Sequence, residues 1–185
     1  MNSFKYWSIM MLTIMMLPLA ASCGDDNDTA DKDVENNNIL LGRWVKVNVK
    51  TISNQSYPNS LEKDYNLEQF VVTISSTSGL TGLTDSQSTT YSSFDEMANQ
   101  VNLEGFIFDE TFTAKPIKYV NGEWTEYGTP FKYVIRDNTL YSIVDEQETM
   151  FGTLNYTYSD QRIVIRKSVS VGGQSIIEEL SYIKY

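Results

Sequence analysis

Short runs in which apolar and polar residues alternate dominate the sequence after residue 39, and this pattern constrains the fold more than any motif. Val, Ile, Thr, Tyr and Phe fill these runs, and Gly, Asn, Asp and Pro separate them. Every second residue of a strand shares one face, so "FIFDETF" and "FKYVI" each predict a buried aromatic face. The predicted strands lie near residues 43–52, 68–75, 105–113, 116–121, 124–128, 131–137, 139–145, 149–158 and 162–184, the last being two strands joined at Gly172-Gly173.

The connections between the later strands are short and polar, which predicts antiparallel neighbours. Asn121-Gly122 is a strong two-residue hairpin signal, Asp137-Asn138 is a softer one, and "YSDQR" at 158–162 is a further polar turn. A meander of this kind must cover both of its edge strands, and closure does so most simply. The sequence therefore predicts an all-β fold, an antiparallel up-and-down β-barrel of about eight or nine strands. A β-sandwich is the alternative.

Two longer segments interrupt the alternation. Residues 53–66 form a predicted connection, and residues 76–104 begin as a loop rich in Ser, Thr and Gly. Within the second segment, "SSFDEMANQVN" predicts one short helix near residues 93–102, with Ser93 as its N-cap and Glu96 three positions later.

Composition excludes several classes of function. The chain has no histidine, one cysteine and a formal net charge of −10, so Ser-His-Asp, Cys-His and zinc chemistry are excluded, and no metal or cofactor is predicted. An acidic chain of this kind is not expected to bind nucleic acid. Two carboxylate clusters could serve a glycosidase, but both lie at strand ends or turns, where carboxylates are ordinarily solvated, so the chain is predicted not to be an enzyme. These clusters are Asp109 with Glu110, and Asp145 with Glu146 and Glu148.

The first 22 residues have the layout of a secretory signal. Lys5 precedes an apolar run, and the small residues Ala20, Ala21 and Ser22 follow it. The run is too short for a membrane span and contains Pro18.

Cys23 stands directly after these small residues, and the segment resembles a bacterial lipoprotein signal. This resemblance implies that the signal, residues 1–22, is removed and that Cys23 is lipidated and anchors the protein in a membrane. Residues 23–38 then form an acidic tether, because residues 24–38 hold six carboxylates, one lysine and little apolar surface. The acidic stretch is similar to the export tag of surface-exposed lipoproteins of the Bacteroidota type. The expected location is the outer membrane, on the cell surface.

The folded part, residues 39–185, opens with "LLGRWVKVNV". This segment resembles the Gly-x-Trp signature of lipocalins and, with the strand order after it, the lipocalin-like domains of Bacteroidota lipoproteins. The resemblance implies that Gly42 and Trp44 close one end of the barrel and that a late arginine packs over the indole ring. In strict alternation Trp44 faces away from the valines that follow it, so either a bulge comes next or Trp44 points outward.

The barrel interior is the candidate binding site. Its predicted lining residues are aromatic, namely Phe106, Phe108, Trp124, Phe131 and Tyr133. An open barrel would take a small hydrophobic or glycan-like ligand in or near its mouth. Alternatively these side chains simply fill the interior, and the protein is an accessory subunit of a surface complex that uses loops 53–66 and 76–104 as its contact surface.

Overall fold

The computed structural model describes residues 39–53, 56–171 and 174–185, which form twelve strands and one helix. The predicted signal, the tether with Cys23 and the Gly172-Gly173 turn lie outside these residues. No helix in the described part is long and apolar enough to cross a membrane. The strands are β1 (Gly42–Ser53), β2 (Ser60–Asn66), β3 (Val71–Thr77), β4 (Thr84–Thr90), β5 (Glu104–Phe108), β6 (Thr113–Val120), β7 (Glu123–Glu126), β8 (Phe131–Arg136), β9 (Thr139–Val144), β10 (Gln147–Thr157), β11 (Arg162–Val171) and β12 (Gln174–Lys184).

Eight of these strands close into an antiparallel barrel. The order runs β1-β5-β6-β8-β9-β10-β11-β12, and β12 pairs back onto β1 from Trp44↔Lys184 to Ser53↔Ile176. This closure confirms the predicted all-β barrel with one short helix. It excludes the alternative of a β-sandwich, because two stacked sheets would leave β1 and β12 unpaired with each other.

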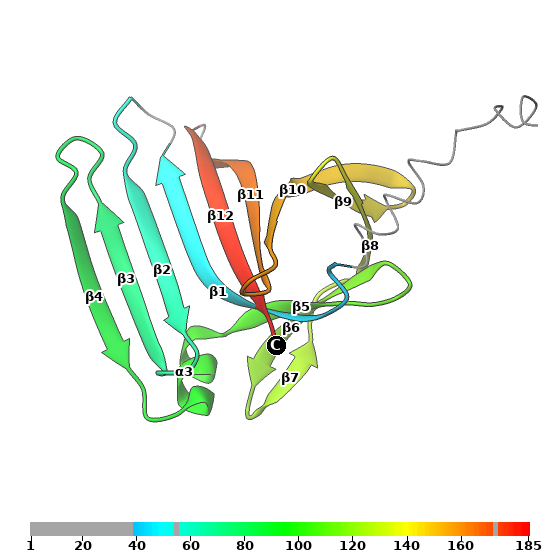
Figure 1. Cartoon of the computed structure of the whole chain (residues 1–185), viewed down its shortest axis with the longest axis horizontal. Coiled ribbons are helices and arrows are strands. Elements are labelled where there is room, and N and C mark those ends of the chain that lie inside the picture. Colours follow the sequence, from blue (N-terminus) through cyan, green and yellow to red (C-terminus); the bar gives the residue numbers. More distant parts are fainter. Residues whose placement is uncertain (1–38, 54–55, 172–173) are drawn as a thin grey trace, which may run out of the picture.

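Three further strands continue the same sheet beyond the barrel at β1, and this extension is called the lobe below. The lobe consists of β2, β3 and β4, and it joins the barrel through five residue pairs between β1 and β2. Figure 1 shows it on the left, continuous with β1 and β12. The expectation that segments 53–66 and 76–104 are loops is therefore wrong for β2 and β4. All seven residues of β4 are exposed, so no apolar alternation marks it as a strand.

A β-bulge in β1 settles the orientation of Trp44. The pairing with β12 shifts register between Lys46 and Asn48, so one extra residue enters β1 there. Because each residue reverses the side-chain direction, this insertion brings Trp44 and Val49 onto the same side of the sheet. Trp44 is fully buried in the barrel core, as the first of the two sequence alternatives predicts.

The helix α3 (Phe94–Val101) confirms the predicted capping pattern. The side chain of Ser93 accepts a hydrogen bond from the backbone N–H of Glu96, and Asn102 ends the helix in the left-handed region at φ 52°. Met97 and Ala98 face inward. They belong to a second core beside the barrel, which packs α3 and the lobe against β1 and β6 and comprises Val45, Tyr65, Val72, Met97, Ala98, Leu103 and Tyr119.

The hairpin turns follow the sequence signals. Asn121-Gly122 and Asp137-Asn138 both adopt positive φ at each central residue, as a tight hairpin turn requires. Gly105 meets a different constraint, because a Cβ there would lie 2.2 Å from the backbone oxygen of Trp44. Only glycine lets β5 approach β1 this closely.

Asp109 holds the turn between β5 and β6. Its Oδ1 atom accepts hydrogen bonds from the backbone N–H groups of Thr111 (2.9 Å) and Thr113 (3.1 Å) and from the Thr111 hydroxyl (2.7 Å). Stabilisation of the charged form, led by the Thr111 hydroxyl, lowers the pKa of Asp109 from 3.8 to about 2. The carboxylate is therefore a structural acceptor within the turn.

We expect Asp109→Ala to lower the free energy of unfolding by about 1–2 kcal/mol, since several hydrogen bonds are lost. The lowered pKa of Asp109 means that its contribution is present above pH 4 and is lost as pH falls from about 4 to about 2. Urea unfolding across this range measures both effects. Asp109→Asn is the control, because it keeps an acceptor and cannot titrate. A wild-type pH dependence that is unchanged in this variant contradicts the assignment.

Candidate functional site

Side chains fill the half of the barrel in which β1 begins. Trp44 donates a hydrogen bond from Nε1 to the backbone oxygen of Leu40 at 2.5 Å, and its ring meets Tyr156 edge-on at 6.2 Å. Gly42 starts β1 at φ +114° beside this layer. The buried core is apolar apart from two tyrosine hydroxyls and the Trp44 indole N–H, and it comprises Leu40, Trp44, Phe108, Ala114, Tyr133, Ile135, Leu140, Leu154, Ile163, Ile165, Leu180 and Tyr182.

Three half-buried phenyl rings lie above this core, toward the opposite end of the barrel. Phe131 and Phe151 are stacked with centroids 5.7 Å apart, and Phe106 meets both rings edge-on at 6.1 Å. They come from β5, β8 and β10. Because β5 and β10 are four strands apart in the eight-strand circuit, the rings meet across the barrel. These three residues are called the aromatic trio below, and they form the floor of the barrel mouth.

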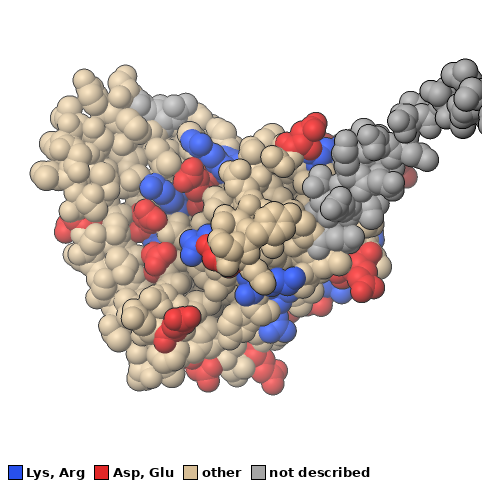
Figure 2. Space-filling view, in the orientation of Figure 1, with Lys and Arg blue, Asp and Glu red and all other residues tan. Residues whose placement is uncertain are grey.

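Two cavities open at the mouth and share Phe151. The larger is about 620 Å³, and its wall is the β8–β9 hairpin, including Pro130, Phe131 and Ile143. The smaller is about 220 Å³ and lies between Phe106, Tyr127 and Tyr182. Figure 2 shows the molecular outline dipping between the lobe and the rest of the protein, with charged side chains gathered in the middle of this face.

The charges around the smaller cavity are paired. Lys46 forms an ion pair with Glu104, and Lys167 forms one with Glu178 at 2.9 Å. The Lys167 ammonium also lies 5.7 Å from the ring centre of Phe151, so it contacts the aromatic trio as a cation–π partner. The smaller cavity is thus aromatic and polar, and the charges named here that line it are paired.

Two tyrosines beside Glu104 have raised pKa values. Burial is the main cause for both, and the negative charge of Glu104 adds to it, so the pKa of Tyr127 and that of Tyr182 lie above the usual value of 10. Both phenols therefore remain neutral hydrogen-bonding groups at physiological pH. Both line the smaller cavity, Tyr127 as a half-buried residue and Tyr182 as a member of the buried core.

The structure divides the five predicted lining residues into three groups. Phe106 and Phe131 reach the mouth, whereas Phe108 and Tyr133 lie lower, in contact at 5.0 Å within the filled core. Trp124 does not lie on the barrel wall, so the prediction that it lines the barrel interior is wrong. Its strand β7 pairs only with β6, outside the barrel circuit, and Trp124 packs against the second core.

Other contributors to the mouth were missed because no local pattern marks them. Phe151 falls next to the second register shift, between Met150 and Gly152, and so outside simple alternation. Lys46 and Glu104 are 58 positions apart and meet only because β1 and β5 pair. The two late arginines both form ion pairs, Arg166 with Glu179 at 3.4 Å and Arg162 with Asp160 at 3.5 Å.

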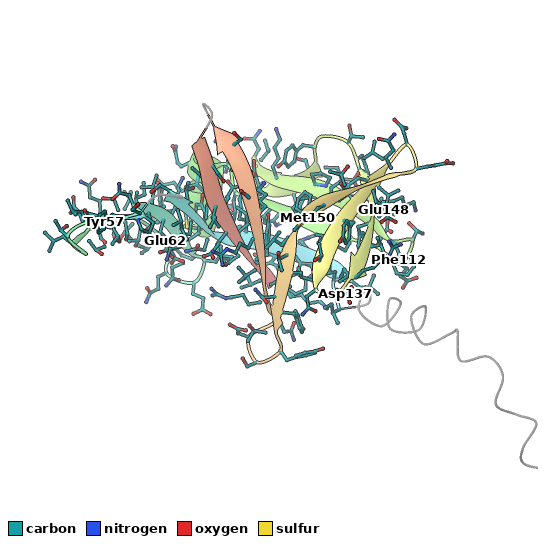
Figure 3. All side chains as sticks on the ribbon, turned by 90° about the horizontal axis from the view of Figure 1, so that it is seen from above. Tyr57, Glu62, Phe112, Asp137, Glu148 and Met150 are labelled. Atoms are coloured by element: carbon teal, nitrogen blue, oxygen red, sulfur yellow. The ribbon has the colours of Figure 1, made fainter. Side chains whose placement is uncertain are left out.

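The two carboxylate clusters do not converge. Asp109 is bound within its own turn, Glu148 pairs with Arg136 at 2.8 Å, and Asp145 and Glu146 form the β9–β10 turn with positive φ. The labels in Figure 3 show Glu148 on the barrel side, far from the lobe tip at Tyr57. Within the described residues, no group of three or more Asp, Glu, Cys or His side chains could hold a metal ion.

Comparison with known proteins adds little to this geometry. No family model and no curated protein matches the sequence. Among solved structures, the chain is similar to the siderocalin Ex-FABP, described as functioning through dual ligand specificities, at 9% identity. The match covers 80% of this chain and 71% of that chain with a TM-score of 0.24. So distant a likeness does not bear on function, and the fold class rests on the strand pairing.

We expect Glu104→Gln to lower the pKa of Tyr127 toward 10, because it removes the negative charge that adds to the effect of burial. Ultraviolet titration of tyrosinate measures this shift, and Tyr127→Phe identifies the transition. Glu110→Gln is the control, since Glu110 lies exposed beside the β5–β6 turn. An unchanged titration in Glu104→Gln contradicts the proposed electrostatic coupling.

Proposed function

We propose that this protein binds a small hydrophobic or glycan-like molecule at the barrel mouth and is not an enzyme. The observation that carries the proposal is the aromatic trio, whose half-buried rings border both mouth cavities above a filled core. The larger cavity, at about 620 Å³, has the size of ordinary ligand pockets. Because buried side chains occupy the barrel core, the proposal assigns the ligand to the mouth.

The paired charges favour a neutral ligand. A charged molecule would have to compete with Lys46–Glu104 or Lys167–Glu178, and breaking either pair leaves a partly buried charge without its partner. A neutral molecule can lie on the phenyl rings and use the tyrosine hydroxyls and the existing ion pairs as hydrogen-bonding groups. Both an apolar ring system and a sugar ring meet these requirements.

The proposal includes attachment to the outer membrane through a lipid on Cys23, with the barrel displayed on the cell surface. The sequence supports it by the order of signal, cysteine and acidic tether. Two or more acyl chains give stable anchoring without a transmembrane helix. The tether, residues 23–38, then separates the folded domain from the lipid.

One observation favours a second candidate, the accessory subunit of a surface complex. Buried side chains fill one half of the barrel, and large apolar side chains are exposed in the loops between β1 and β2 and between β3 and β4. They include Tyr57 (61% exposed), Leu80 (71%) and Leu83 (73%). In this alternative the lobe is the contact surface and the mouth stays empty.

We expect Phe151→Ala to weaken binding of the neutral dye Nile red about tenfold, because the substitution removes a ring shared by both cavities. Fluorescence titration gives the affinity, and an oligosaccharide array tests the glycan arm with the same variant. Tyr158→Ala is the matched control, since Tyr158 is 77% exposed in the turn after β10. Equal affinities of the two variants, or no ligand in either arm, favour the accessory-subunit function.

We expect Cys23→Ser to abolish incorporation of labelled fatty acid, because the sequence contains no other thiol. Metabolic labelling followed by immunoprecipitation measures the lipid, and protease accessibility on intact cells measures display. Lipid that remains on the variant contradicts anchoring at Cys23. A variant that lacks lipid and is still displayed contradicts the role of the lipid in display.

A further inference from the structure

The outer edge of β4 is an unpaired strand edge. Within the described part of the chain, β4 ends the sheet, and its only strand partner is β3. Natural edge strands are ordinarily protected by lysine, proline, a bulge or a covering element. The sequence of β4, "TDSQSTT", has no lysine or proline and one charged residue, Asp85, and its pairing with β3 runs without a register shift.

The hydrogen bonds beside β4 show which backbone groups face outward. Just beyond its two ends, Leu83 accepts from the N–H of Ser78 and Tyr91 donates to the oxygen of Phe70. Hydrogen-bonded positions alternate in an antiparallel pair, so the odd-numbered residues of β4 bond to β3. The N–H and C=O groups of Thr84, Ser86, Ser88 and Thr90 therefore point to the free edge.

We infer that β4 pairs with β4 of a second copy in an antiparallel, two-fold arrangement centred on Gln87. In this register Thr84 lies opposite Thr90 of the second copy, and Ser86 lies opposite Ser88 of the second copy. These are the outward-facing residues, so each such pair exchanges two backbone hydrogen bonds. A two-fold interface uses the same edge of both copies and closes at the dimer. The inference is independent of ligand binding at the mouth.

The side chains are self-complementary in the same register. On one face, β3 and β4 already pair hydroxyl with hydroxyl, as in Thr73–Ser88 (2.9 Å) and Ser75–Ser86 (2.8 Å). The second copy continues this pattern, because Ser faces Ser and Thr faces Thr across the new boundary. The hydroxyl ladder is thus continuous from β3 to β3 of the second copy.

The low charge of β3 and β4 also favours a second copy of this chain as the partner of the free edge. Asp85 is the single charged residue of β3 and β4, and in this register it lies opposite Thr89 of the second copy and not opposite its equivalent. The two strands next to the free edge therefore bring one negative charge from each copy to the contact. Past the strand end, exposed Leu83 comes opposite Tyr91 of the second copy, which gives an apolar contact at each end of the interface.

Cysteine trapping tests the register. With Cys23→Ser in the full chain, Gln87→Cys places two thiols across the two-fold axis at a Cα separation of about 4.5 Å, within disulfide range. We expect mild oxidation to trap a disulfide-linked dimer of the purified protein. Thr89→Cys is the matched control on the same face, because its equivalent lies four residues away along the strand, about 13 Å. We expect on the order of tenfold less dimer from this control.

A charge exchange at the same position tests the two-fold axis without a covalent bond. Gln87→Lys and Gln87→Glu each place like charges directly opposite and should shift the protein to monomer in sedimentation velocity. Mixing the two variants should restore the dimer. Any of three results overturns the inference. Gln87→Cys and Thr89→Cys are trapped equally, the protein is a monomer at every concentration, or the mixture is no more dimeric than either variant alone. A Gln87→Cys adduct with a different protein in place of the dimer also overturns it.

Discussion

The structure depends on the hydrogen bonding of β1 to three other strands. One edge of β1 pairs with β12 along almost its full length, while the other edge pairs first with β5 and then with β2. The bulge between Lys46 and Asn48 lies at this exchange of partners, and it keeps both halves of β1 facing the barrel interior. Because β1 belongs to both the barrel and the lobe, backbone hydrogen bonds join the two parts into one sheet.

The barrel separates its stabilising and its recognition surfaces along one axis. Its lower half is packed with buried apolar and aromatic side chains, and it provides a rigid base. Its upper half is packed less completely. There, aromatic rings line a cavity, and the charged side chains beside it form ion pairs. Aromatic rings at the mouth can therefore be exposed without destabilising the fold, since most of the buried side chains that stabilise it lie in the lower half.

Local sequence signals predicted the parts of this fold that depend on neighbouring residues. Ser93 and Glu96 define the helix start, and Asn121-Gly122 defines a hairpin, because capping and turn geometry need only a few adjacent positions. Strand β4 was missed because backbone pairing and hydroxyl contacts with β3 stabilise it, without an apolar face. The mouth was predicted only in part. The pairing of Lys46 with Glu104 and the displacement of Trp124 depend on which strands become neighbours, and residue spacing does not encode that.

The contact between β6 and β8 is the shortest in the barrel circuit, with the pairs Thr113↔Lys132 and Ala114↔Phe131. Beyond Ala114, β6 turns to β7 as its partner, and residues 127–130 bridge the gap next to both mouth cavities. Local opening costs least where few backbone bonds must break. This seam is therefore the part of the barrel wall that the fewest strand pairs hold, and it borders the entrance.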